Sequence, residues 1–144
     1  MGMTTAASII SFARKLEQES ARLYESLAQK YPRGSEVFLE FSRENGKNVS
    51  QVERAYYSVI TDAIEGGFAF DMDEASWALD ASLADADSYS DAVARAVQME
   101  GKITRFYSEA AEQSKGLMAD VPKAFLAIAR KRRGRPQKLE SLLG

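Results

Sequence analysis

The stretch Met99-Glu-Gly-Lys-Ile-Thr-Arg-Phe-Tyr107 decides the fold, because a similar pattern occurs 83 residues earlier, in Leu16-Glu-Gln-Glu-Ser-Ala-Arg-Leu-Tyr24. In both stretches an apolar residue precedes Glu, and a second apolar residue precedes Tyr. Apolar residues recur in steps of three or four, which is typical of an amphipathic helix. We therefore expect two helices with the same buried face, and we interpret their similarity as an internal duplication.

A second pair of segments repeats with a shift of 87 residues: Phe38-Leu-Glu-Phe-Ser-Arg-Glu-Asn-Gly-Lys-Asn48 and Phe125-Leu-Ala-Ile-Ala-Arg-Lys-Arg-Arg-Gly-Arg135. The apolar spacing predicts helices at about Thr5–Lys30, Ser35–Glu65, Ser90–Ser114 and Pro122–Leu143. We expect Ser35 and Asp120 to be N-caps and Pro136 to kink the last helix. No stretch alternates with period two for long enough to predict a strand, so the predicted fold class is all-α.

The connections between these helices differ in length. Short loops follow the first and third helices, whereas residues 66–89 form a long connection with six acidic residues and no basic one. Within it, Asp73–Leu79 is predicted to form a short helix, and the apolar anchors are Phe68, Phe70, Trp77 and Leu79. This order predicts one domain, residues 1–144, folded as a four-helix bundle with a long crossover between the second and third helices.

Composition excludes most common catalytic groups. The 144 residues are 45% hydrophobic and 28% charged, with a formal net charge of −2, which is ordinary for a globular protein. The chain has no cysteine and no histidine. Disulfides, zinc–thiolate sites, thiol nucleophiles and His-dependent triads are therefore excluded. We find no basic leader and no apolar run of membrane-spanning length, so we expect a cytoplasmic protein.

Polar residues interrupt all four apolar stripes at a similar depth. The interrupting residues are Glu17, Asn45, Asn48, Glu100, Arg132 and Arg135, and Tyr24 and Tyr107 lie two turns beyond the glutamates. The two carboxylates cancel the two guanidiniums, and a guanidinium pairs well with a carboxylate. We predict a buried network at this level. The alternative is that these side chains lie on solvated flanks.

The four quoted segments, in this order and spacing, resemble the ferritin-like superfamily, in particular rubrerythrin-type proteins, over about residues 9–143. Members hold two metal ions with one Glu from each of two helices and a Glu-x-x-His motif from each of the other two. By position, Glu17 and Glu100 match the lone glutamates. Asn45-x-x-Asn48 and Arg132-x-x-Arg135 occupy the places of the two Glu-x-x-His motifs.

This resemblance implies the fold without the metal. A guanidinium does not ligate metal, both histidines are missing, and so is the cysteine-rich tail of rubrerythrin. We therefore expect no bound metal, no other cofactor and no catalytic residue. The expected function is that of a structural or interaction protein, favoured over an enzyme, and the expected assembly is a homodimer.

Two alternatives stay open. In the first, the chain is a metal-dependent oxidoreductase or peroxidase of the rubrerythrin type, in which oxygens of Glu40, Glu44 and the two Asn residues hold iron or manganese. In the second, the basic segment Arg130–Pro136 binds DNA, because its Arg-Gly-Arg-Pro sequence resembles the AT-hook. A helix with some arginines outward and Arg132 and Arg135 inward explains the segment without DNA, so we do not expect nucleic acid as a partner.

Overall fold

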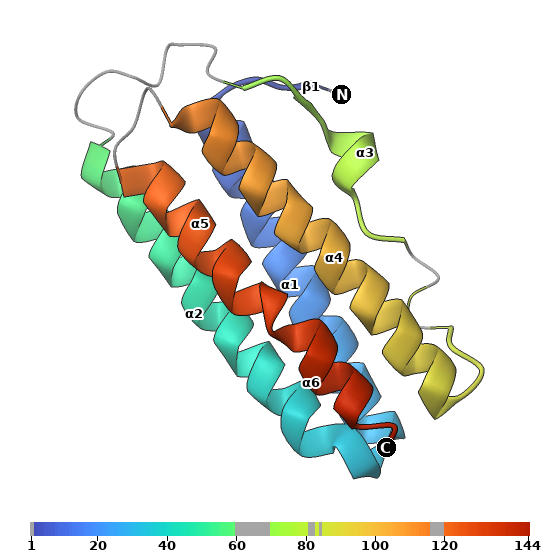
Figure 1. The fold of residues 1–144 in the computed structure, drawn as a ribbon. Helices are drawn as coiled ribbons and strands as arrows, with labels where there is room; N and C mark the ends of the chain where they lie inside the picture. The colour runs from blue at the N-terminus through green and yellow to red at the C-terminus, as the bar shows by residue number, and fades with distance from the viewer. Residues whose placement is uncertain (1, 60–69, 81–82, 84, 116–119) are drawn as a thin grey trace.

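The computed structural model describes residues 2–59, 70–80, 83, 85–115 and 120–144 (Figure 1). Helices dominate these residues, which confirms the all-α class. The long helical elements are α1 (Ala6–Lys30), α2 (Ser35–Val59), α4 (Tyr89–Ser114), α5 (Asp120–Arg133) and α6 (Arg135–Ser141). The short elements are β1 (Gly2–Met3), η1 (Pro32–Gly34), β2 (Met72–Asp73) and α3 (Glu74–Trp77).

Two of the long helices, α1 and α4, begin at a side-chain cap. The side chain of Thr5 accepts a hydrogen bond from the backbone N–H of Ser8 and so caps α1, and the side chain of Ser88 caps α4 in the same way. The predicted N-cap role of Ser35 is wrong. Ser35 has helical angles, φ −58° and ψ −37°, because the 3-10 turn η1 leads directly into α2. The predicted helix at residues 60–65 lies outside the described residues.

The predicted fourth helix is interrupted. Helix α5 ends at Arg133 and α6 begins at Arg135, with Gly134 between them. Pro136 has no N–H, so the carbonyl of Arg132 loses its helical hydrogen-bond donor. The kink expected from Pro136 is thus present, although as a break between two helices. Asp120 is the first residue of α5.

The long helices pack side by side, as Figure 1 shows. Helix α1 packs against α2, and α4 packs against α5 and α6. Helix α2 also contacts α5, which closes the assembly on that side. The connection that contains α3 runs beside α4 (Figure 1), where the Lys102 ammonium donates a 2.6 Å hydrogen bond to the Ala78 carbonyl. The predicted short helix is confirmed as α3, one turn long.

A small antiparallel pairing ties the start of the chain to this connection. Gly2 pairs with Asp73 and Met3 with Met72, and both methionines are buried. The sequence did not predict strands here, because two residues are too few to show a period-two pattern.

The core follows the predicted stripes. The predicted buried face of α4 is buried throughout, at Val93, Ala96, Glu100, Ile103, Tyr107 and Ala110. The predicted face of α1 is buried except at the half-buried Tyr31; its buried members are Ile10, Ala13, Glu17, Ser20, Tyr24 and Leu27. Of the connection's apolar anchors, Phe70 is buried and Trp77 and Leu79 are half-buried, while Phe68 lies outside the described residues. Among the described helices, none has both the length and the apolar character needed to cross a membrane.

Candidate functional site

The structure brings together the polar residues of the four stripes. Glu17 and Tyr24 come from α1, Asn45 and Asn48 from α2, and Glu100 and Tyr107 from α4. Arg132 comes from α5 and Arg135 from α6. Each of these eight side chains is 2% exposed or less. We call the set Glu17, Asn45, Asn48, Glu100, Arg132 and Arg135, with the two tyrosines Tyr24 and Tyr107, the charge layer.

Arg132 is the centre of the charge layer. Its Nη2 and Nε atoms donate to the two carboxylate oxygens of Glu17, at 2.8 and 3.3 Å. Its Nη1 donates to Oε1 of Glu100 at 2.6 Å, and Nη2 also reaches Oδ1 of Asn45 at 3.2 Å. One planar guanidinium therefore bridges both buried carboxylates, a geometry that the fork of arginine permits and the point charge of lysine does not.

Arg135 lies on the α2 side of the charge layer. Its Nη1 donates to Oε2 of Glu100 at 3.0 Å, while Nη2 donates to Oε1 of Glu44 at 3.0 Å and to the Phe41 carbonyl at 3.3 Å. The guanidinium carbon also lies 4.5 Å from the centroid of the Phe41 ring, within cation–π distance. Arg135 thus joins a buried carboxylate to a half-exposed one.

The two asparagines complete the surroundings of Glu17. The Asn48 side-chain amide donates to Oε1 of Glu17 at 3.3 Å, and the Asn45 amide donates to the Glu17 backbone carbonyl at 3.2 Å. Four buried polar atoms have no hydrogen-bond partner within the described parts of the chain, and two of them belong to the charge layer: Asn48 Oδ1 and Arg135 Nε, the others being Ser20 Oγ and the Tyr89 hydroxyl. Because an unpaired buried polar atom costs about 1–3 kcal/mol, the charge layer is not the most stable way to fill this space.

Each tyrosine donates to the carboxylate on the facing helix. The Tyr107 hydroxyl donates to Oε2 of Glu17 at 2.6 Å, and the Tyr24 hydroxyl donates to Oε2 of Glu100. Burial raises the pKa of both hydroxyls well above 10.0, and the neighbouring carboxylates raise it further. Both tyrosines therefore stay protonated and act as donors.

The arginines keep Glu100 ionised despite its burial. Burial on its own raises the pKa of this carboxyl, but the attraction to Arg132 and Arg135 outweighs it and lowers the pKa below 4.5. For Arg132, burial on its own lowers the pKa, but the carboxylates of Glu100 and Glu17 outweigh it and raise the pKa well above the ordinary value of arginine. Glu100 and Arg132 therefore form a pair of ions at neutral pH.

These residues do not fit a di-metal centre. The carboxylates of Glu17 and Glu100, which the resemblance matches to the lone glutamate ligands, are instead joined by the guanidinium of Arg132. A guanidinium keeps its proton in proteins and repels a dication. Over the described ranges, no group of three or more carboxylate residues is placed to hold a metal ion. We derive no metal chemistry from this site.

The donors of the alternative metal site are already paired. Glu40 accepts from Lys138 at 3.1 Å, and Glu44 accepts from Arg135 at 3.0 Å. The pocket that both glutamates line, of about 190 Å³, is also lined by three cationic residues: Lys131, Arg135 and Lys138. This arrangement suits a cation poorly.

The AT-hook residues are part of the helices. Arg133, Gly134, Arg135 and Pro136 span the junction of α5 and α6, and Arg135 is buried in the charge layer. An extended arginine pair for the minor groove is therefore not present. Of the basic run, Arg130, Lys131 and Arg133 are exposed.

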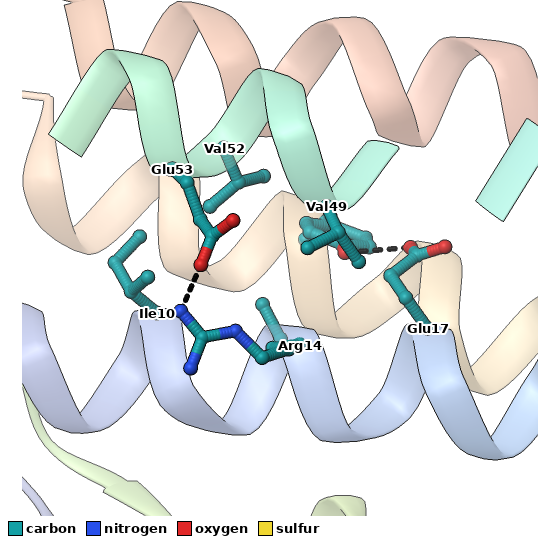
Figure 2. A pocket seen from close by; sticks show the side chains of 8 residues that line it. Ile10, Arg14, Glu17, Val49, Val52 and Glu53 are labelled. Carbon is teal, nitrogen blue, oxygen red and sulfur yellow. Dashed lines mark hydrogen bonds and ion pairs between the residues drawn. The ribbon is translucent and has the colours of Figure 1, made fainter. Parts of the chain in front are cut away.

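A small pocket between α1 and α2 reaches the edge of the charge layer (Figure 2). Glu17 and Tyr107 line it, together with Ile10, Val49 and Val52. Figure 2 shows Arg14 of α1 paired with Glu53 of α2 beside it. This ion pair links the two helices about one turn from Glu17 and leaves the pocket little room.

Sequence reasoning missed Glu44 and the Phe41 carbonyl as partners of Arg135. Glu44 lies one residue outside the predicted α2 stripe and is 31% exposed, so periodicity alone places it on the flank. The only available signal was its position one turn before Asn48, on a helix face next to the stripe.

No protein-family model, curated protein or solved structure matches this chain.

Proposed function

We propose that the protein is a ferritin-like four-helix bundle with a degenerate di-metal site, in which the charge layer replaces the metal ions. It serves as a structural or interaction module and has no redox or hydrolytic centre. What supports this proposal is the preserved spacing of the ligand positions together with their changed chemistry.

The observation that carries the proposal is the position of Arg132. Its guanidinium donates to both Glu17 and Glu100, the two residues that the ferritin-like pattern reserves for metal ligation. The Arg132 guanidinium, whose charge is fixed, takes the place of a metal ion that could exchange or change its oxidation state. The space is thereby neutralised without redox chemistry.

Metal loading tests the proposal. The untagged protein is incubated with iron(II) or manganese(II) under reducing conditions, desalted, and subjected to elemental analysis. We expect no stoichiometric metal and no peroxide turnover above that of the free metal ion, because Arg132 holds both carboxylates.

The Glu17→Gln variant is the matched control for metal bound elsewhere on the surface. Metal that the wild type and this variant retain equally is not held by the charge layer. Two metal ions per chain that Glu17→Gln loses would show a working centre and would overturn the proposal.

A further inference from the structure

A groove between α2 and α5 is lined mainly by cationic residues. Its lining residues are Arg43, Gly46, Lys47, Ser50, Gln51 and Arg54 of α2 and Lys131 of α5. Four of the seven are cations, and none is a carboxylate. We call it the cationic groove.

The cations of the groove are free to bind. Arg43, Lys47, Arg54 and Lys131 are all exposed, and none forms an ion pair with another described residue. Lys131 donates to the Gln51 side chain at 3.2 Å, which holds its ammonium over α2. Neighbouring acidic residues Glu40, Glu44 and Glu53 are each paired with a different cation.

The groove continues to an exposed aromatic ring. Arg43, Lys47, Ser50, Arg54 and Tyr57 follow each other in steps of three or four, so they share one face of α2. Tyr57 is 58% exposed. From Arg43 to Tyr57 the helix rises about 21 Å, which spans a few nucleotides of an extended strand.

Glycine at the floor of the groove has no packing role in this chain. Gly46 lies in the middle of α2, where glycine weakens a helix relative to alanine. A Cβ atom built there would meet nothing within 4 Å. Packing among the described residues therefore does not require glycine here, and the missing side chain leaves the backbone open to a close approach from outside.

We propose that the cationic groove binds single-stranded nucleic acid, with the phosphates along Arg43, Lys47, Lys131 and Arg54 and a base stacked on Tyr57. Cations that track a backbone and aromatic rings that stack bases are the two components of sequence-tolerant single-strand binding. An acidic protein segment would form ion pairs with the cations but would not require the aromatic ring of Tyr57. The described part of the acidic connection around α3 lies beside α4 (Figure 1), and none of its described residues lines the groove.

This inference goes beyond the proposed function and does not depend on it. The charge layer is tested by metal content and by unfolding, whereas the groove is tested by binding. The groove residues are exposed and the layer residues are buried, so either proposal can fail alone.

Fluorescence anisotropy with a labelled oligothymidylate of about 12 nucleotides is the direct test. Four phosphate contacts predict that the affinity of the wild type falls about 50-fold between about 50 and 200 mM salt. In the Arg43→Ala/Lys47→Ala variant two contacts remain, so binding is weaker and the same salt change costs only about sevenfold. Absence of binding at low salt would overturn the proposal.

The matched control removes the same charge from the opposite side. Arg22 of α1 and Arg105 of α4 are exposed and lie outside the groove. We expect Arg22→Ala/Arg105→Ala to keep the wild-type affinity and salt dependence. An equal loss in both double variants would mean nonspecific attraction and would contradict the assignment to the groove.

Substitutions at Tyr57 and Gly46 separate nucleic acid from other polyanions. Tyr57→Leu is expected to weaken oligothymidylate binding at least about fivefold, whereas Tyr57→Phe keeps it. Gly46→Gln is expected to reduce affinity without lowering the melting temperature, because Gln favours helix and its side chain enters the groove. If Tyr57→Leu binds normally, or inorganic polyphosphate competes as well as the oligonucleotide, the ligand is a phosphate chain alone and the proposal is wrong.

A last measurement tests whether the groove binds the acidic connection of a second copy of this chain instead of nucleic acid. Salt-sensitive self-association that Arg43→Ala/Lys47→Ala abolishes, without any oligonucleotide binding, would assign the groove to the acidic connection of a second copy and would overturn the proposal. Light scattering at low salt measures this self-association.

Discussion

Tyr107 on α4 donates a 2.6 Å hydrogen bond to Oε2 of Glu17 on α1. Tyr24 on α1 donates in turn to Oε2 of Glu100 on α4. The shift of 83 residues that relates the two helices matches Glu17 with Glu100 and Tyr24 with Tyr107. The two hydrogen bonds are therefore equivalent in the two helices. This exchange of partners agrees with an internal duplication, in which two similar halves pack face to face.

Loss of one buried carboxylate is expected to be costly. Glu100→Leu leaves Arg135 without its buried partner and Arg132 with only one carboxylate, so we expect a loss of about 3–5 kcal/mol of unfolding free energy. Urea denaturation measures it. The exposed Glu140→Leu is the matched control, with a change below about 0.5 kcal/mol. A cost for Glu100→Leu below about 1 kcal/mol would disprove the paired layer.

Removal of Arg135 together with Glu100 is expected to restore part of the unfolding free energy that Glu100→Leu loses. In Glu100→Leu/Arg135→Leu the remaining buried ions, Glu17 and Arg132, still balance each other. We expect the double variant to be more stable than the sum of the two single changes by about 1–3 kcal/mol. Additive effects would show that the two residues do not interact.

The fork of Arg132 matters as much as its charge. Lysine keeps the charge at this position but cannot donate to Glu17, Glu100 and Asn45 with the same planar geometry. We expect Arg132→Lys to reduce the unfolding free energy by about 2–3 kcal/mol. Exposed Arg130→Lys, two residues away, is the control and should melt like the wild type. Equal melting temperatures would mean that charge alone is sufficient.

Acid is expected to weaken the charge layer through Glu100. Folding lowers the pKa of this carboxyl below 4.5, so its stabilisation is complete above pH 4.5 and is lost as the pH falls through the folded value. The difference in unfolding free energy between wild type and Glu100→Gln should therefore be constant near neutrality and narrow below pH 4.5. A difference independent of pH would contradict the ionised state.

Alkali is expected to act through the tyrosines. Because folding raises the pKa of Tyr24 and Tyr107 above 10.0, the stability that they contribute is present below pH 10 and is lost as the pH rises through their folded values. Ultraviolet titration of phenolate should show both ionising only as the protein unfolds. In Tyr24→Phe/Tyr107→Phe the amplitude of that cooperative step should fall, and an unchanged amplitude would contradict this assignment.

Helical periodicity accounts for most of what the sequence predicted. A period of 3.6 residues places Glu17 below Tyr24 and Arg132 beside Ile128 on the buried face, so the depth of each polar residue follows from its own helix. The role of Ser35 was wrong because capping rules are local and ignore the turn that precedes α2.

The contacts that the sequence did not predict depend on how the helices pack against one another. Glu44 reaches Arg135 only because α6 lies beside α2 at that point. Similarly, Lys131 is far from Arg43 and Arg54 in the sequence, and only the contact of α2 with α5 places the three in one groove. A single sequence carries no direct signal for such neighbours.

The partners of Glu17 also set an order of events during synthesis. Its counter-charge, Arg132, lies 115 residues further along the chain and is therefore made later. Until α5 has left the ribosome, the hairpin of α1 and α2 would have to bury a carboxylate with only asparagine amides beside it, at a cost of several kcal/mol. We therefore expect a chain that lacks α5 to keep Glu17 in water and to pack loosely. Closure of the core around α1 and α2 thus depends on a guanidinium that α5 supplies from a distant part of the sequence.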